Sequence, residues 1–489
     1  MDIFGIIYKA LDGLKKEISK LASKNDVNKQ ISDTKTYTTA IINETKSEID
    51  NNKQDALYLT LNDDTSKVKR YLDLKVDIMK WGNYNGLMWI TEDNENQGFI
   101  GGGVNFAALN DGNVVYYNNK TIIDTIVSKP LRKVVAVLSL DGNLLSETVL
   151  EKLFKNNTNL KYVLEVKNTE NNSFRETFYG CTNLKEFPKG LDKAINLNST
   201  FAYSGLRGLN KITFNCNYAT SAFANCSDLE TIKDLHIDCR GVRQLFYRCE
   251  KLHSIDGLYI GSEDSPTEAS QAFGSCSSLY SIHNLEIYTY GVRDLFAYCS
   301  SLPSIGRFKL FIDNTVNQIS GTAIHRNGLF SCCGSLDNIN NIEIIQKDLN
   351  LPMKIALWFY ECRNLTIMPA HNLYIDVGSY DIFSCCEKLK TIQGTIRVTD
   401  AAEIGISMFN LCESLQDFNG FVGIAGGHYT FSSSPHLTYQ SMQSIINNLG
   451  NAKFEKHDLV FRKTPYANLT PDDIAIAVNK GWNVISTNY

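Results

Sequence analysis

Residues 222–232 read AFANCSDLETI, and residues 245–255 repeat the pattern as LFYRCEKLHSI. Both segments place Phe, Cys, Leu and Ile at steps of three residues, and further copies follow along the chain. Self-similarity at a period of about two dozen residues is typical of a solenoid, in which stacked units bury their apolar edges against one another. The copies start at Phe154, Phe178, Phe201, Phe223, Phe246, Phe273, Phe296, Phe330, Phe359, Phe383, Phe409 and Phe431.

Each copy is followed by a short stretch in which apolar and other residues alternate. Alternation with a period of two predicts a half-buried strand, and stacked strands should form a parallel sheet along one face. The Phe-to-Ile segment predicts a turn of irregular or 3₁₀-like backbone. We therefore expect an α/β leucine-rich-repeat solenoid over residues 151–437, with a parallel strand ladder and short helical turns. The clearest strand segments are residues 235–237, 258–260, 285–287 and 373–375.

The quoted segments, together with AFGSCSSLYSI at residues 272–282, resemble the BspA-type (treponemal-type) leucine-rich repeat. The resemblance recurs through the whole array and implies the solenoid fold. That family is associated with surface adhesins and host-contact proteins, so the resemblance implies a binding surface. A solenoid alone does not identify the ligand.

Most of the 13 cysteines follow the repeat. We interpret those in the repeat slot as small buried side chains that fill a tight column, because Ser204 and Ser434 occupy the same slot. Reduced thiols are expected from synthesis in the cytoplasm. The other four cysteines are Cys216, Cys239, Cys332 and Cys385, and the last two each directly precede a slot cysteine. None of the four has the spacing of a zinc-binding pair, so we expect neither a metal site nor a cofactor. The slot cysteines are Cys181, Cys226, Cys249, Cys276, Cys299, Cys333, Cys362, Cys386 and Cys412.

Residues 1–55 predict an N-terminal helix with a sparse apolar seam. The three-four spacing of this seam is typical of a coiled coil, and so thin a stripe needs association to be stable in water. We expect a homo-oligomer and favour a trimer; the alternative is one amphipathic helix packed on the next domain. The seam contains Leu11, Leu14, Ile18, Leu21, Ile31, Ile41 and Ile49.

Two further regions flank the solenoid. Residues 56–150 predict a small β-rich connecting domain, with strands at 57–61 and 134–138 and a turn at 110–113. Residues 438–489 predict a helical C-terminal cap, with one helix capped by Thr438 and a second capped by Thr470 and ended by Gly481. Residues 469–484, LTPDDIAIAVNKGWNV, resemble the end of repeat proteins from phages and prophages of gut bacteria.

Composition and motifs exclude several functions. The net charge of −5 disfavours nucleic acid as the main partner, and no apolar run is long enough for membrane insertion. The first residues read poorly as a secretion signal. No nucleophile elbow, zinc-protease helix or phosphate loop is present, so we expect no enzymatic activity, although an acid pair assembled by the fold would be invisible in the sequence.

These features predict a virion-associated adhesin, either a phage tail fibre or another receptor-binding protein. Its N-terminus would attach to a tail or collar protein, and the solenoid would bind a glycan or protein receptor on the host surface. A virion protein is made in the host cytoplasm and needs no secretion signal. The alternatives are a bacterial cell-surface adhesin of the BspA type and an intracellular scaffold for protein–protein contacts.

The outward positions of the strand column are the candidate receptor-binding residues. Aromatic rings beside charged groups suit both sugars and proteins. The other interpretation is an ordinary solvated sheet face. Longer steps after residues 260, 311 and 346 predict loops that either bind or are merely tolerated. The candidates are His236, Asp238, Tyr259, Glu286, Tyr288, Lys309, Tyr374, Asp376 and Arg397.

Overall fold

The computed structural model describes residues 86–91, 97–101, 134–141 and 150–488, with gaps at 164–165, 168, 317–327, 354–356, 371–373, 376–380, 399–407, 423, 425 and 454–456. All belong to the second of two units of the chain, Asn85–Tyr489. The expected coiled-coil seam, the strand at 57–61 and the turn at 110–113 lie outside the described residues. None of the helices within the described residues is long and apolar enough to span a membrane.

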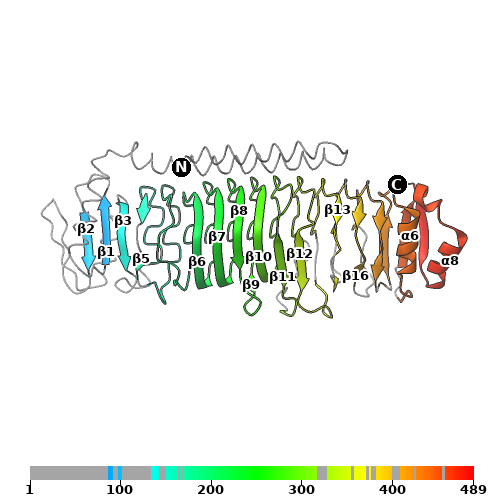
Figure 1. Ribbon diagram of the computed structural model, residues 1–489, viewed down its shortest axis with the longest axis horizontal. Coiled ribbons are helices and arrows are strands. Elements are labelled where there is room, and N and C mark those ends of the chain that lie inside the picture. Colours follow the sequence, from blue (N-terminus) through cyan, green and yellow to red (C-terminus); the bar gives the residue numbers. More distant parts are fainter. Residues whose placement is uncertain are drawn as a thin grey trace, which may run out of the picture. The chain divides into compact units, whose positions relative to one another are not determined.

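A seven-stranded parallel sheet forms the centre of the described chain (Figure 1). Strand β9 (Thr267–Glu268) is inserted beside β10 and β7. The predicted parallel ladder is therefore confirmed, and the alternating segments at 235–237, 258–260 and 285–287 lie in strands of this sheet. In spatial order the other strands are β12 (Ile342–Gln346), β11 (Phe308–Ile312), β10 (Ser281–Gly291), β8 (Ser254–Ile260), β7 (Thr231–Gly241) and β6 (Gly208–Tyr218).

Beyond β12 the ladder continues as two narrow parallel sheets. One contains β13 (Ile367–Met368), β15 (Thr391–Ile392) and β17 (Asp417–Phe418). The other contains β14 (Tyr374–Ile375), β16 (Ile396–Val398) and β18 (Phe421–Val422). Each repeat in this part therefore contributes two short strands to two sheets.

A continuous stack of phenylalanine rings forms the spine of the core. All twelve predicted phenylalanines belong to it, from Phe154 at one end to Phe431 at the other, with neighbouring ring centroids 4.9 to 5.9 Å apart. The stack goes one ring further, to Phe461 at 5.6 Å. Ring stacking adds specific contacts to the burial of apolar area, so equivalent positions of successive repeats stay in register.

The turns between strands are irregular, as one of the two expectations had it, and the 3₁₀-like or helical alternative is wrong for the described residues. Between residues 151 and 437 the described residues contain strands and turns but no helix. In the turn from Phe223 to Cys226 the cysteine N–H donates to the phenylalanine carbonyl oxygen, while Asn225 has φ 58°. A positive φ at the third residue is typical of a type II turn and interrupts any 3₁₀ helix. The fold is a parallel β-solenoid, consistent with a leucine-rich-repeat solenoid.

At the N-terminal end, β1 (Gly86–Thr91) pairs antiparallel with β2 (Gln97–Gly101) and β3 (Val134–Asp141). Strand β3 covers the strand predicted at 134–138. It also pairs in parallel with β4 (Tyr162–Val163) and β5 (Val166–Lys167). The sheet thus runs across residue 150, where the sequence suggests a domain boundary; that boundary stays a prediction.

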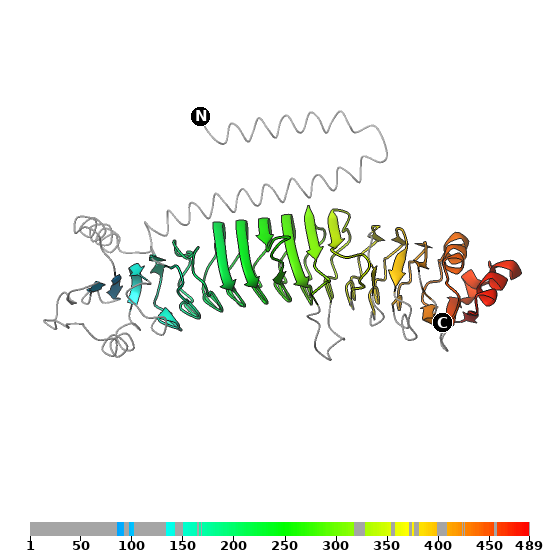
Figure 2. The same ribbon diagram turned by 90° about the horizontal axis from the view of Figure 1, so that it is seen from below.

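The C-terminal segment contains the predicted helices and two strands that were not predicted. Helix α6 (Tyr439–Asn447) begins at Thr438 and α8 (Pro471–Asn479) at Thr470, which forms a capping box with Asp473. Strands β20 (His457–Arg462) and β21 (Asn483–Thr487) extend in parallel from β19 (Gly427–Phe431), and short α7 (Lys463–Tyr466) follows β20. The segment is mixed rather than purely helical (Figure 2). That it caps the stack stays a prediction.

The slot cysteines form a ladder of hydrogen bonds. Each of the nine thiols donates to the carbonyl oxygen of the phenylalanine that starts the preceding repeat, at 3.0 to 3.2 Å. All nine are buried, as predicted. Small size alone does not explain the slot, because its side chain also donates a hydrogen bond. Ser434, which replaces cysteine in one repeat, donates from Oγ to the Cys412 carbonyl oxygen at 3.1 Å.

Candidate ligand-binding face

Four of the predicted binding residues lie in one row across four strands. His236 in β7 is opposite Tyr259 in β8, Tyr259 is opposite Glu286 in β10, and Glu286 is opposite Lys309 in β11. Their neighbours Leu235, Leu258, Leu285 and Phe308 are fully buried, so alternation points the four side chains to the other face. We call His236, Tyr259, Glu286 and Lys309 the polar row.

The aromatic side chains of the polar row stack on each other. The ring centroids of His236 and Tyr259 are 4.4 Å apart and their planes differ by 13°. His236 Nε2 also lies 3.2 Å from an Asp234 carboxylate oxygen. The facing sides of the two rings and His236 Nε2 are therefore used within the protein, and the Tyr259 hydroxyl remains for a ligand.

A charged cluster occupies the other half of the row. Lys309 Nζ donates to the Tyr288 hydroxyl at 3.3 Å and lies 5.3 Å from the centre of that ring. The Tyr288 hydroxyl donates to Glu286 at 3.5 Å, and Arg307 lies 3.5 Å from the same carboxylate. The hydrogen bond to Tyr288 raises the pKa of Lys309, so this ammonium group stays charged at neutral pH.

The remaining predicted residues are not members of the row, although Tyr288 contacts two of its members, Glu286 and Lys309. Asp238 is exposed in β7 opposite Asn215, and Tyr288 packs beside Phe311 at 5.5 Å. Strand β8 lies between β7 and β10 and ends at Ile260, so it has no paired residue between Asp238 and Tyr288. Asp376 and the seam residues lie outside the described residues.

Tyr374 and Arg397 form a separate group in the sheet of β14 and β16. They are opposite each other, with the guanidinium 4.1 Å from the centre of the tyrosine ring. Arg397 also donates to the Leu349 carbonyl oxygen at 2.9 Å. This pair therefore helps to hold the loop after β12, on which Leu349 and Leu351 are 47% and 43% exposed. The sequence pattern aligned the pair with the polar row, but the structure does not bring them together.

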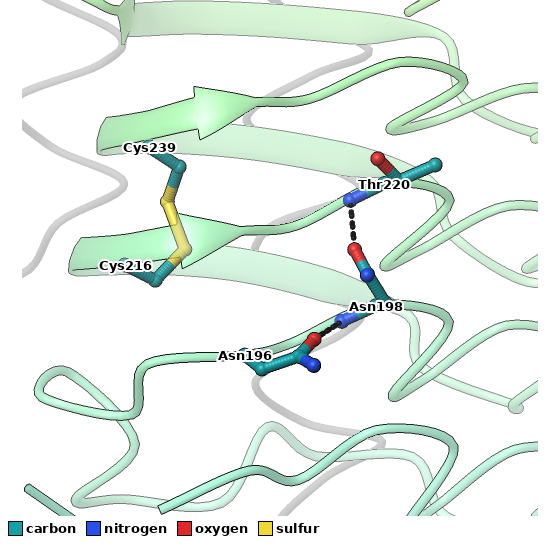
Figure 3. Close-up of a disulfide and its surroundings, with 5 residues drawn as sticks. All are labelled: Asn196, Asn198, Cys216, Thr220 and Cys239. Atoms are coloured by element: carbon teal, nitrogen blue, oxygen red, sulfur yellow. Dashed lines mark hydrogen bonds between the residues drawn. A yellow bond between two sulfur atoms is a disulfide. The ribbon is translucent and has the colours of Figure 1, made fainter. Parts of the chain in front are cut away.

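A disulfide between Cys216 and Cys239 was missed by the sequence analysis, and the expectation of reduced thiols is wrong for this pair. The bond joins β6 to β7, whose register places the two cysteines opposite each other with Cα atoms 4.7 Å apart (Figure 3). Both follow an inward residue, Phe214 or Ile237, by two positions. Aligning the strand segments, rather than only the Phe-to-Ile motif, would have paired them.

Two asparagine side chains near the disulfide accept hydrogen bonds from backbone N–H groups, and the Asn198 side chain ties successive turns together (Figure 3). The Asn198 N–H donates to Asn196 Oδ1 at 3.0 Å, and the Thr220 N–H donates to Asn198 Oδ1 at 2.8 Å. A similar side-chain ladder runs from Ser221 through Gln244 and Gln271 to Asp294. These contacts were also not predicted, because they depend on the register between turns.

No metal site emerges within the described ranges, where no three His, Cys, Asp or Glu side chains are grouped to hold an ion. Burial raises the pKa of Cys181, Cys226 and Cys276 to about 12. These thiols therefore stay protonated at neutral pH, and thiolates are the form that binds metals and reacts. The slot cysteines serve packing and hydrogen bonding.

Comparison with known proteins identifies other leucine-rich-repeat structures with similarity to this chain. The chain shows no match among curated proteins. A solved leucine-rich repeat protein from Bacteroides ovatus is 14% identical, over 73% of this chain and 95% of that one, with a TM-score of 0.28. A leucine rich cell surface protein from Faecalibacterium prausnitzii is 14% identical, over 59% of this chain and 79% of that one, with a TM-score of 0.20.

The family model for the BspA type leucine rich repeat region matches residues 143–253 and 326–460 in six copies. These segments make up half of the chain, and they contain ten of the twelve phenylalanines whose stacking is described above. The chain belongs to the BspA-type leucine-rich-repeat family.

Proposed function

We propose that this chain is an adhesin-like scaffold without enzymatic activity, which binds a cell-surface ligand on the polar row. The observation that carries the proposal is the register of His236, Tyr259, Glu286 and Lys309 across four paired strands. A rigid sheet that presents polar and aromatic side chains in a line suits a large surface ligand better than a small molecule, which prefers a concave pocket.

The disulfide supports a role outside the reducing cytoplasm. Disulfides persist in oxidising surroundings and are rare where thioredoxin and glutathione keep thiols reduced. The Cys216–Cys239 bond therefore favours an adhesin over an intracellular scaffold. Family membership points the same way, because BspA-type repeats are associated with surface proteins.

We further propose that the adhesin is carried on a phage tail. The support is in the sequence: the apolar seam of residues 1–55 suits a trimeric stalk that attaches to a tail or collar protein, and residues 469–484 resemble phage-borne repeat proteins. The second candidate is a bacterial cell-surface adhesin. It has specific support in the family membership and would use the same face.

Finding the protein on virions or on bacterial cells distinguishes the phage proposal from the cell-surface proposal. Mass spectrometry of purified virions should detect the chain at a constant ratio to a tail protein. Brief trypsin treatment of intact bacteria should release no peptides from it. Peptides from cells and none from virions would refute the phage proposal and support the cell-surface adhesin.

The binding face is tested by replacing the two tyrosines at the polar row together, because Tyr259 belongs to the row and Tyr288 contacts Glu286 and Lys309. The double variant Tyr259→Ala/Tyr288→Ala should reduce adsorption of the labelled chain to its target cells about tenfold, the loss of a typical interface contact. Tyr298→Ala, at a 60% exposed turn residue outside the polar row, is the matched control. Equal adsorption of the double variant and the wild type would remove the polar row as the binding site.

A further inference from the structure

The polar row offers a ligand side-chain tips and no backbone. Strands β7, β8, β10 and β11 are paired on both sides, so their N–H and carbonyl groups are used within the sheet. A peptide that adds to a sheet needs a free edge, and an amphipathic helix needs an apolar groove. Phe311, an apolar residue beside the row, is only 6% exposed, and Ile345 opposite it is half-buried. These recognition modes therefore do not fit this face.

Charge disfavours polyelectrolytes. Lys309 is opposite Glu286 on one side and Glu343 on the other, and Arg307 lies 3.5 Å from Glu286. A polyanion laid along the row would meet the two carboxylates, and a polycation would meet Lys309 and Arg307. Like charges brought together cost binding energy, so the alternation favours an uncharged polymer.

The side chains of the row match hydroxyl groups. A carboxylate only accepts hydrogen bonds, an ammonium group only donates them, and a phenol hydroxyl does both; Glu286, Lys309 and Tyr259 supply one of each. They recur at the strand spacing of about 4.8 Å, so a chain lying across the strands meets a polar tip at every strand. Sugar hydroxyls both donate and accept, and they recur along a polysaccharide in the same way.

We propose that the polar row binds a neutral polysaccharide laid along the stack of strands, with sugar hydroxyls hydrogen-bonded to Tyr259, Glu286 and Lys309. The inference rests on the proposed function and names the ligand class of the same face. Thr213 opposite His236 and Glu343 opposite Lys309 would extend the contact by one strand at each end.

Affinity electrophoresis of the full chain tests the ligand class. Gels containing dextran, mannan or galactan are compared with gels containing alginate, a polyanion, or poly-lysine, a polycation. At least one neutral polymer should retard the protein at concentrations at which the two charged polymers do not. Retardation by a charged polymer alone, or by none of the five, overturns the proposal.

Three variants test the residues. Tyr259→Phe removes one hydroxyl, Glu286→Gln removes one charge, and Lys309→Met removes the ammonium group. Each should weaken retardation by the neutral polymer about tenfold, the loss expected for one hydrogen bond. Tyr298→Phe is the matched control. Unaltered melting temperatures show that the variants fold, and equal retardation of wild type and all three variants overturns the site.

Periodate treatment of target cells separates this proposal from the proposed function. Oxidation of cell-surface sugars should abolish adhesion of the labelled chain. Adhesion that survives periodate but not protease overturns the polysaccharide ligand and leaves the adhesin proposal standing. Retardation by a neutral polymer without adhesion to any cell of a gut-bacterial panel supports the ligand class and overturns the adhesin proposal.

Discussion

The thiol of Cys249 donates a hydrogen bond to the carbonyl oxygen of Phe223, one repeat earlier, at 3.1 Å. Both side chains are buried, and the same pair of positions is linked in every repeat that has a slot cysteine. The carbonyl group belongs to a turn rather than to a strand, so the sheet ladder does not satisfy it. The cysteine column is thus a second set of hydrogen bonds between turns, parallel to the sheet.

Replacing this thiol tests its role as a donor. Cys249→Ala should lower the free energy of unfolding by roughly 2 kcal/mol, because it leaves a small cavity and removes one of the two hydrogen bonds to the buried Phe223 carbonyl oxygen. Cys249→Ser should lose less, since a hydroxyl keeps a donor in the slot, as that of Ser434 does toward the Cys412 carbonyl oxygen. Urea unfolding followed by circular dichroism gives both values. A serine variant as unstable as the alanine variant would show that the hydrogen-bond donor adds no stability at this position.

The disulfide predicts a thiol count. Eleven of the 13 cysteines are free, so the unfolded, unreduced protein should contain eleven reactive thiols, and reduction should raise the number to 13. Thirteen thiols before reduction would contradict the bond. Cys216→Ser/Cys239→Ser should lower the free energy of unfolding by about 3 kcal/mol, as expected for closure of a loop of this length.

Thiol reactivity in the folded protein should follow burial. At pH 8, iodoacetamide should modify only Cys332 and Cys385, which are partly exposed, whereas the nine slot cysteines are buried. Desolvation also raises the pKa of Cys332, so slow reaction is expected there. Peptide mapping after a timed reaction measures both effects. Early modification of Cys249 or Cys276 would show that the turns open readily.

Asp228 should make stability depend on pH in acid. Hydrogen bonds from Lys185 and Lys251, both at 2.8 Å, lower its pKa to about 2. The folded pKa lies below the ordinary value of about 3.9, so the stabilisation is complete above pH 4 and disappears as the pH falls towards 2. Because the groups are partly exposed, it should amount to roughly 1 kcal/mol or less.

Thermal unfolding of Asp228→Asn and wild type between pH 2 and 7 checks this dependence. The variant should be less stable at pH 5 to 7 and equal to wild type near pH 2. Asp238→Asn, at an exposed position in β7, is the charge-matched control and should show no such convergence. A difference between Asp228→Asn and wild type that persisted at pH 2 would point to packing rather than charge.

Repetition made the core and the polar row predictable. Equivalent positions of neighbouring repeats must meet when strands stack in parallel and in register, so Phe223 predicts its contact with Phe246, and Tyr259 its place beside His236. Where the spacing between repeats changes, equivalent positions no longer meet. The loop after β12 separates Arg397 from Lys309, although both follow the same strand pattern, and Arg397 contacts the Leu349 carbonyl oxygen instead.

The sequence by itself determined the period, the phenylalanine stack, the direction of the sheet and the family, because each depends only on which residue types recur and how often. The tertiary structure alone decided the turns with a positive φ at their third residue, in place of 3₁₀ segments, and the thiol donors to the phenylalanine carbonyl groups. It also decided the two strands after residue 450 and the Cys216–Cys239 bond. These features depend on backbone conformation and on the register between particular turns. The repeat pattern, which averages over turns, does not contain that information.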